Sequence, residues 1–426
     1  MTSEIIIMNT DVIALAADST ITINDKKTYN GVNKIFMLSN DPPMGIMVFG
    51  LGKFENISIE TLIKEYSKKT DFKKLKNIIN IKNDFLRYLT EVTQATNINI
   101  FLDSHLKNFK QMINQQRNSC NELEFYQFIE TFSNVEIFEF LKDIFETEKY
   151  NEKFKEIIKE YDESKINLNN LKKCFCSYIF NISTGIVIAG FNKEDMFPSY
   201  VSFNIIANVN NMLLYQDMDT KLNYSGTLII PFAQTDVIGT YLSGINETLE
   251  NEIKKHFVNI MENYICNMYG HLSVEKLEKI NEIKNQLTKN FKTHINSLKK
   301  DFYSPILESL DFLPREEIGN LAESLIQITS LKRKIDSNLE SVGGNIDVAL
   351  ISKGDGFIWK KRNPYFDPKI NPQFFDEKMN LKRLSREWRT RGIGIDKEYL
   401  DKRSKEIDRE VMKEIEFEKR WKKMEK

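Results

Sequence analysis

The chain has 426 residues, 41% of them hydrophobic, so it can bury a sizeable core in at least one globular unit and is not disordered throughout. Its 60 Lys and Arg balance 61 Asp and Glu, which gives a formal net charge of -1. Such a balance provides no overall field that would attract nucleic acid, an acidic substrate or an anionic membrane. Any partner of that kind would need a local patch of charge.

The cysteines and histidines argue against disulfide and metal chemistry. Four Cys over this length form no disulfide framework, and Cys174-x-Cys176 lacks the spacer and the second pair of a zinc site. Each of the four His stands alone in a helix-like stretch without a ligand partner three or four residues away. We therefore expect no cofactor and no metal. Reduced cysteines, no secretory signal and no apolar run of roughly 18 residues predict a cytoplasmic protein without a membrane span.

The first part of the chain is predicted to contain four strands and then a helix. Residues 5–8 and 12–17 are short apolar runs separated by turn-forming residues, which is typical of a buried hairpin. Residues 34–38 and 45–49 form a second pair, separated by a turn with two prolines. Helical periodicity over 58–66, with Ser58 as the N-cap, predicts the first helix.

The middle of the chain is predicted to hold a helical insertion followed by more strands. Apolar residues recur at three- and four-residue spacing from 70 to 172, with almost no Gly or Pro, which indicates several amphipathic helices. Strand signals return at 176–180, 185–191, 200–206 and 227–232. These runs predict a second group of antiparallel strands.

The last third is predicted to be largely helical. Helical patterns cover 235–300, with a break at Gly270, and 314–339, where Pro314 suits a first helical turn. A strand over 345–352 closes the core. A connector rich in Pro and Asn then leads into a highly charged, helix-like tail.

The tail contains one basic and aromatic segment, residues 386–391. Its Arg and Trp side chains could stack on a base or bind an RNA phosphate. Amphipathic helices of mixed charge more often pack on their own domain or on a neighbouring subunit. Nucleic-acid binding is therefore the weaker of the two interpretations.

Three short motifs in or beside the predicted strands resemble a known family. Ala16-Ala17-Asp18-Ser19 closes the second strand, Val32-Asn33-Lys34-Ile35 opens the third, and Val342-Gly343-Gly344 leads into the last. With Thr2 after the initiator Met1, they resemble a proteasome β-type subunit, or its bacterial relative in the HslV group, among the N-terminal nucleophile (Ntn) hydrolases. Asp18 and Lys34 lie 16 and 32 positions after Thr2, as the catalytic Asp and Lys of that family do after its nucleophile.

The resemblance implies a fold and an assembly. The fold class is α+β, a four-layer αββα Ntn-hydrolase sandwich with a helical insertion and a charged C-terminal helical tail. The predicted parts are 1–69, 173–265 and 313–360 for the core, 70–172 for the insertion, 266–312 for a helical extension, and 361–426 for the tail. The implied partners are a peptide or protein substrate and further copies in a homo-oligomer, and an ATP-dependent unfoldase or another protein partner is left open.

The resemblance also assigns roles. Removal of Met1 would expose Thr2 as the nucleophile of a threonine-type peptidase, and its own α-amine would be the base, because the pKa of a free α-amine is about 7.7 to 8.0. Lys34 would favour the neutral amine by like-charge repulsion, and Asp18 would hold the lysine charged. The amide of Gly50 would form the oxyanion hole. Weaker supporting candidates are Ser19, Gly52, Thr235 and Ser341.

One alternative of the same fold stays open. The chain could be a catalytically inactive relative that acts as an oligomeric scaffold or interaction protein through its insertion and tail. In that case Asp18 and Lys34 would be a buried ion pair retained for fold specificity.

Overall fold

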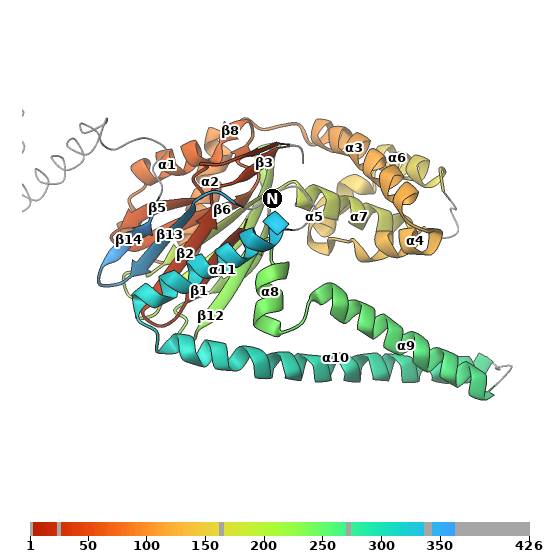
Figure 1. Cartoon of the computed structure of the whole chain (residues 1–426). Helices are drawn as coiled ribbons and strands as arrows, with labels where there is room; N and C mark the ends of the chain where they lie inside the picture. Colours follow the sequence, from red (N-terminus) through yellow and green to blue (C-terminus); the bar gives the residue numbers. More distant parts are fainter. Residues whose placement is uncertain (1–2, 24–26, 162–165, 270–273, 336–342, 363–426) are drawn as a thin grey trace, which may run out of the picture. The chain divides into compact units, whose positions relative to one another are not determined.

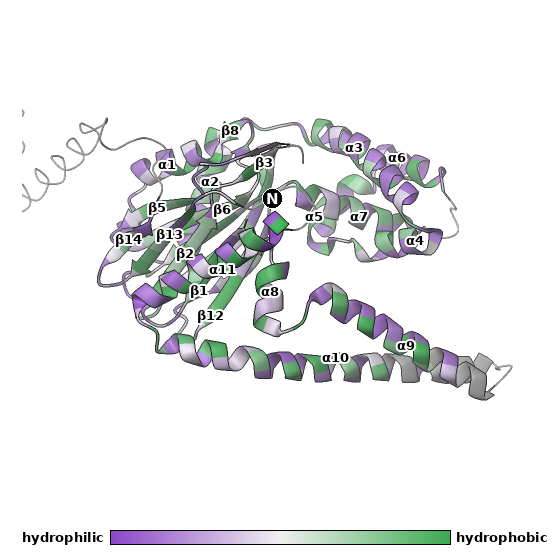
Figure 2. Ribbon diagram, viewed as in Figure 1, coloured by the Kyte–Doolittle hydropathy of each residue, from purple (hydrophilic) through white to green (hydrophobic). Residues whose placement is uncertain are grey.

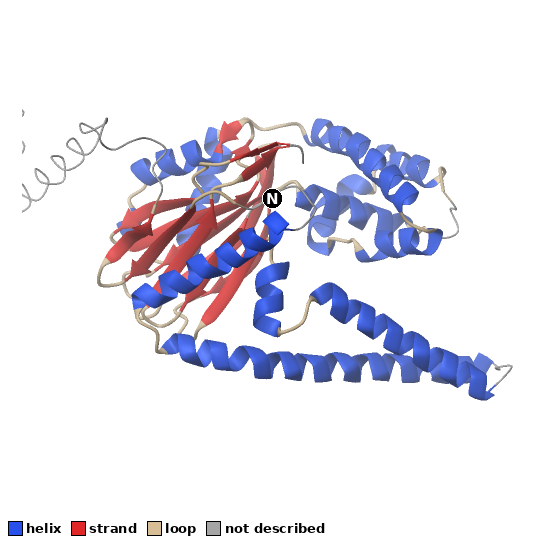
Figure 3. Cartoon of the chain, viewed as in Figure 1, coloured by secondary structure: helices blue, strands red, loops and turns tan. Residues whose placement is uncertain are grey.

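The computed structural model describes residues 3–23, 27–161, 166–269, 274–335 and 343–362. Within these ranges the protein is a mixed α+β structure with antiparallel sheets, as the strands and helices of Figure 3 show. None of the described helices combines the length and the apolarity that crossing a membrane requires.

The first sheet contains both ends of the described chain. Its five antiparallel strands, in spatial order, are β12 (Leu228–Ala233), β1 (Ser3–Met8), β2 (Val12–Asp18), β13 (Ile346–Ser352) and β14 (Gly356–Lys361). Every residue of β1 and β2 is buried, which agrees with their uninterrupted apolar sequences. The register places Ser3 opposite Ala233 and Asp18 opposite Ile346. The start of β1 and the end of β2 therefore lie at the same end of the sheet.

The second sheet also has five antiparallel strands. Their spatial order is β11 (Met212–Lys221), β10 (Ser199–Val209), β9 (Thr184–Gly190), β6 (Pro43–Gly50) and β5 (Ile35–Asn40). Two short ribbons accompany the sheets, one formed by β3 (Ile21–Ile23) with β4 (Lys27–Tyr29), the other by β7 (Lys53–Phe54) with β8 (Ile57–Ser58).

A hydrophobic cluster joins the two sheets. Ile6 and Leu15 of the first sheet belong to the same buried cluster as Met47, Val187 and Tyr200 of the second. Alternate residues of a strand point to opposite faces, so the intervening residues of β1 and β2 must be covered on the other side. The central strands β1 and β2 are predominantly hydrophobic in Figure 2, as burial on both faces requires.

Helices cover the outer faces of both sheets. The bounds of the helices on the second sheet are Ile59–Lys69 for α1 and Ile78–Val92 for α2, with a 3-10 turn over Phe72–Lys74 between them. On the first sheet, α8 (Asp236–Ser243) and α11 (Arg315–Ile335) pack against Ile5 and Ala14. Figure 1 shows α11 crossing β1 and β2.

Five further helices, α3 to α7, share a core of their own. Their bounds are Ile98–Ser119, Glu122–Thr131, Val135–Phe145, Glu148–Ile158 and Leu168–Asn181. Phe109, Phe154 and Phe175 are fully buried in that core, which also includes Ala207 and Val209 of β10. The insertion therefore packs against one end of the second sheet.

Two long helices, α9 (Glu247–Tyr269) and α10 (Val274–Asp311), pack against each other. Phe257 stacks on Phe291 with ring centroids 5.5 Å apart, and Lys299 forms an ion pair with Glu250. Where Figure 2 colours them, both helices alternate between polar and apolar residues.

Most predicted elements are confirmed, with several corrections. The prediction of a strand over 176–180 is wrong, because this run belongs to α7, where Cys176 and Ile179 face the core of the insertion. The short strands β3, β4, β7 and β8 were not predicted, and neither were β11 and β14. The helical stretch after 235 has a further break that was not predicted, at Gly244, whose φ of 72° ends α8 before α9 begins at Glu247. The tail beyond 362 lies outside the described residues.

The cluster between the sheets gives a stability prediction. Leu15 is fully buried there, so Leu15→Ala should lower the free energy of unfolding by about 2 to 5 kcal/mol, through lost burial and the cavity left behind. Leu249→Ala on α9 is the matched control, since Leu249 is 55% exposed. Urea unfolding of both variants measures the difference, and equal losses would contradict the packing described here.

Candidate active site

The carboxylate of Asp18, at the end of β2, accepts four hydrogen bonds. Its Oδ1 accepts from the backbone N–H of Ser3 (3.0 Å) and from Nζ of Lys34 (2.5 Å). Its Oδ2 accepts from the backbone N–H groups of Thr20 (3.3 Å) and Gly343 (3.1 Å). Asp18 is almost wholly buried, and four donors supply the solvation that burial removes.

The Lys34 side chain connects the two sheets. It immediately precedes β5 of the second sheet, and its Nζ lies against Asp18 and 3.4 Å from Oε1 of Glu4, both in the first sheet. The side chains of Glu4 and Asp18 are fully buried, and that of Lys34 is 6% exposed. The predicted pairing of Asp18 with Lys34 is therefore present, and it lies in the interior, where water screens the attraction little.

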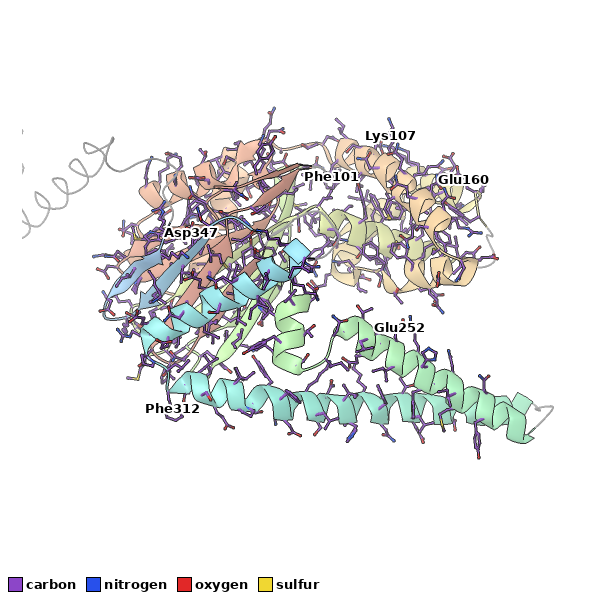
Figure 4. The ribbon with its side chains drawn as sticks, in the orientation of Figure 1. Phe101, Lys107, Glu160, Glu252, Phe312 and Asp347 are labelled. Atoms are coloured by element: carbon purple, nitrogen blue, oxygen red, sulfur yellow. The ribbon has the colours of Figure 1, made fainter. Side chains whose placement is uncertain are left out.

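Glu4 is the part of this cluster that sequence reasoning missed. It directly precedes the apolar run Ile5–Ile7, and a charged residue in a strand buried on both faces needs a partner. In the register, Ala17 lies between Glu4 and Asp347, so two buried carboxylates flank one alanine across three strands. Figure 4 labels Asp347 on β13.

Hydrogen bonds hold the loop that follows Asp18. The carbonyl oxygen of Ser19 accepts from the N–H groups of Gly31 and Val32, each at 3.0 Å. Gly344 packs directly on this loop with a φ of 71°, and a Cβ there would lie 2.6 Å from Oγ of Ser19. Glycine suits that φ and that approach, which accounts for the second glycine of the Gly343-Gly344 motif. The Ser19 hydroxyl is buried and has no hydrogen-bond partner among the described residues.

Gly50, the predicted oxyanion donor, ends β6. The N–H of Val48 donates to the carbonyl oxygen of Lys34 at 2.9 Å. Because N–H groups alternate in direction along a strand, the N–H of Gly50 points toward the same side as that of Val48, about 7 Å further along. Gly50 has a φ of 78°, and a Cβ there would lie 2.6 Å from the carbonyl oxygen of Ser183, so the position admits only glycine.

The other predicted site residues make fewer contacts with the Asp18–Lys34 pair or none among the described residues. Gly52 accepts a hydrogen bond from the N–H of Ile59 through its carbonyl oxygen, and no described contact joins it to the Asp18–Lys34 pair. Thr235 immediately precedes α8, two residues after Ala233, and makes no side-chain cap. Thr2 and Ser341 lie outside the described residues.

Ala233 is a second feature that sequence reasoning missed. It lies opposite Ser3 in the register and has a φ of 60°, which L-residues other than Asn and Asp rarely adopt. Such strained positions concentrate near functional sites. No sequence pattern signals it, because alanine itself does not favour that conformation.

No family model matches the sequence, and no curated protein matches it either. Within the described ranges, no group of three or more His, Cys, Asp or Glu is arranged to hold a metal ion. The residues and their geometry therefore carry the functional argument.

The ion pair gives a second stability prediction. Asp18→Asn should lower the free energy of unfolding by about 3 to 5 kcal/mol, because it leaves the buried Lys34 with one fewer negative partner and gives the backbone donors a weaker acceptor. Denaturant unfolding, monitored by circular dichroism, measures the change.

Glu65→Gln is the matched control for that variant. Glu65 also pairs with a lysine, Lys68, at 2.9 Å, but both side chains are largely exposed. Exposed pairs contribute little to stability, so this variant should unfold like the wild-type protein. If Asp18→Asn also left the free energy of unfolding unchanged, the Asp18 carboxylate would not stabilise the fold as described above.

Proposed function

We propose that this protein is a proteasome-like N-terminal threonine hydrolase that cleaves amide bonds of peptides or proteins through Thr2 after removal of Met1. The observation that carries the proposal is the buried Asp18–Lys34 pair, whose carboxylate also accepts from the N–H of Ser3. The residue before Ser3 is covalently joined to that amide nitrogen. The hydroxyl and the amine of a processed chain would thus begin next to a fixed cation.

The proposed reaction has two stages. The α-amine of Thr2 accepts the proton of the Thr2 hydroxyl, whose oxygen attacks the substrate carbonyl carbon. The tetrahedral intermediate collapses, the C–N bond breaks, and the leaving amine takes the proton back from the α-ammonium, which leaves an ester on Thr2. Water then attacks this ester with the same amine as the base, and the acid product leaves.

Lys34 and Gly50 have complementary roles in this scheme. A cation near the α-amine favours its neutral form, because two unit charges 4 Å apart interact by about 4 kcal/mol at an effective dielectric of 20. The Gly50 N–H would donate to the oxyanion, a kind of contact typically worth about 2.7 to 4 kcal/mol in the transition state. The arrangement of β5 and β6 supports this, since the Val48–Lys34 bond brings the end of β6 to Lys34.

The layering of the elements supports the Ntn sandwich as the fold. Two antiparallel sheets share one cluster, and each has helices on its other face. Members of that family assemble into rings, and we extend this to a homo-oligomer here. Ile328, Leu331 and Ile335 are exposed at helical spacing on α11, and such apolar stripes commonly lie in subunit interfaces.

We also propose a cytoplasmic location. Cys120, Cys174 and Cys176 are free thiols, as expected in a reducing compartment. Burial raises the pKa of Cys174 to about 12, so its thiol stays protonated and unreactive.

The decisive experiment is mass spectrometry of the intact protein. We expect the loss of Met1 and covalent labelling of Thr2 by an epoxyketone or a β-lactone probe, because both react with a hydroxyl activated by its own amine. Thr2→Ala should abolish labelling. Thr248→Ala, an exposed threonine on α9, should label like the wild-type protein.

Two outcomes would contradict the proposal. A mature protein that keeps Met1 has no free α-amine on Thr2 and therefore no base. A processed protein that no probe labels would instead be the inactive scaffold, and Thr2→Ala would then leave its assembly unchanged.

A further inference from the structure

Exposed apolar side chains follow one side of α9. Four residues that are 43 to 63% exposed form what we call the α9 stripe: Leu249, Ile253, Ile260 and Tyr264. At 3.6 residues per turn, steps of four, seven and four residues keep these side chains within about 60° of one another around the helix. Single apolar residues on a surface are ordinary, whereas an aligned set on a helix is typical of a face that packs against another element.

The helix that α9 packs against does not cover the α9 stripe. The contacts with α10 lie on a neighbouring side of α9, where Phe257 stacks on Phe291 with ring centroids 5.5 Å apart and Glu250 pairs with Lys299. These contacts hold α9 and α10 together as an antiparallel hairpin. The stripe stays outside the hairpin's own packing, as its exposed fractions show.

The spacing of the α9 stripe is the same in both directions along the helix. Its midpoint falls between residues 256 and 257. A second copy of α9, laid antiparallel about a two-fold axis at that midpoint, brings Ile253 to Ile260 and Leu249 to Tyr264 of the other copy. Such self-complementarity is what a two-fold contact between identical chains requires.

The connection to the sheets favours the antiparallel direction. Only three residues separate α9 from α8, and α8 packs on the first sheet. Two copies of α9 that ran parallel would bring their first sheets to the same end of the pair. Antiparallel copies keep the sheets at opposite ends, where they do not compete for space.

The polar residues beside the stripe are compatible with this contact. The flank away from α10 carries Glu252, His256, Asn259 and Asn263, all of them exposed; Figure 4 labels Glu252 on this side. In an antiparallel two-fold pair this flank faces the same flank of the other copy, so Glu252 lies near the amides of Asn259 and Asn263. The two Glu252 residues are nine positions apart along the axis, roughly 14 Å, so like charges do not meet. Polar residues thus border an apolar centre, as in ordinary interfaces.

The size of the surface suits a stable pair. With 23 residues, α9 is about 35 Å long. Leu298 and Phe302 of α10, close to Lys299 in the chain, are 47% and 64% exposed, so the hairpin's second helix also offers apolar surface. A face about 35 Å long and two helices wide, roughly 20 Å, buries up to about 700 Å² per copy, near the ~800 Å² per partner of standard stable interfaces.

We propose that the α9 stripe is the contact of an antiparallel two-fold dimer, in which the α9–α10 hairpins of two copies of this chain form a four-helix bundle. Ile253 of each copy packs against Ile260 of the other, and the two His256 residues lie beside the axis. This contact is separate from the exposed residues of α11. It does not depend on the proposed hydrolase activity.

Light scattering and sedimentation of the full-length protein test the association. Ile253→Glu should halve the wild-type mass and raise the dimer Kd roughly a hundredfold or more, because two-fold symmetry places the glutamate in the contact twice. Ile100→Glu is the matched control, at an isoleucine of α3 that is 66% exposed, and should keep the wild-type mass. The urea comparison of Leu15→Ala with Leu249→Ala is then made in the Ile253→Glu background, where Leu249 faces solvent.

Two results of these measurements would overturn the proposal. One is a wild-type protein that is a monomer at every concentration. The other is a folded Ile253→Glu protein that keeps the wild-type mass. If residues 364–426 of the same chain covered the stripe instead, a benzophenone at position 253 would link within one chain, and that result would also overturn the proposal.

Single-cysteine variants test the direction of the pair, in a chain whose Cys120 and Cys266 are replaced by serine. His256→Cys should form a disulfide between two copies, because the two positions differ by a single step along the axis. Ile253→Cys should not link to itself, since its two copies lie roughly 10 Å apart along the axis, beyond the usual Cα–Cα range of about 4.4 to 6.8 Å. Mixed with Ile260→Cys, it should form the disulfide.

Lys255→Cys is the matched control for the disulfide. Lys255 is exposed and lies on the opposite side of α9 from the stripe, so this variant should stay reduced. A disulfide that forms equally well in Lys255→Cys, one in Ile253→Cys alone, or none in His256→Cys would overturn the antiparallel pair. Thr2→Ala should give the same disulfides, so failure of the hydrolase and failure of the dimer are told apart.

Discussion

The carboxylate of Asp18 is the point on which the arrangement of this end of the molecule depends. It accepts hydrogen bonds from the backbone N–H groups of Ser3 and Gly343 and from the ammonium of Lys34. These donors come from both sheets and from three distant parts of the sequence. A buried carboxylate is stable only with such partners, so one side chain fixes the start of β1, the entry to β13 and the approach of β5.

In the rest of the fold, the apolar clusters and the charged residues around Asp18 lie in different places. The clusters between and outside the sheets are apolar, whereas the charged residues near Asp18 lie where β1 begins and β2 ends. Residues on strands are positioned more precisely than residues on loops, which suits a group of charges that must be held in one geometry. The insertion has its own core, and it meets the second sheet at β10.

The sequence predicted the hairpins, because continuous apolar runs are local signals, whereas the Asp18–Lys34 pair was expected only from the family resemblance. It did not predict β11, whose residues are mostly exposed and therefore lack a hydrophobic period. It misassigned 176–180, because a short apolar run fits a buried strand and a buried helix equally well. Glu4 and Ala233 were missed for another reason: their roles depend on cross-strand register, which joins residues 4 and 17, and 3 and 233.

The charged residues around Lys34 are the feature on which the proposed function rests. Replacing a buried ion pair by apolar residues of similar volume is often neutral or stabilising, so stability gives little reason to keep three charged side chains together. An ammonium has three N–H donors, and among the described residues the partners of Lys34 are Asp18 and Glu4. Nζ of Lys34 donates a hydrogen bond to Asp18 and lies within ion-pair distance of Glu4. In the proposed function this buried cation would also act on the amine of Thr2, which would give the three charged side chains a role beyond joining the sheets.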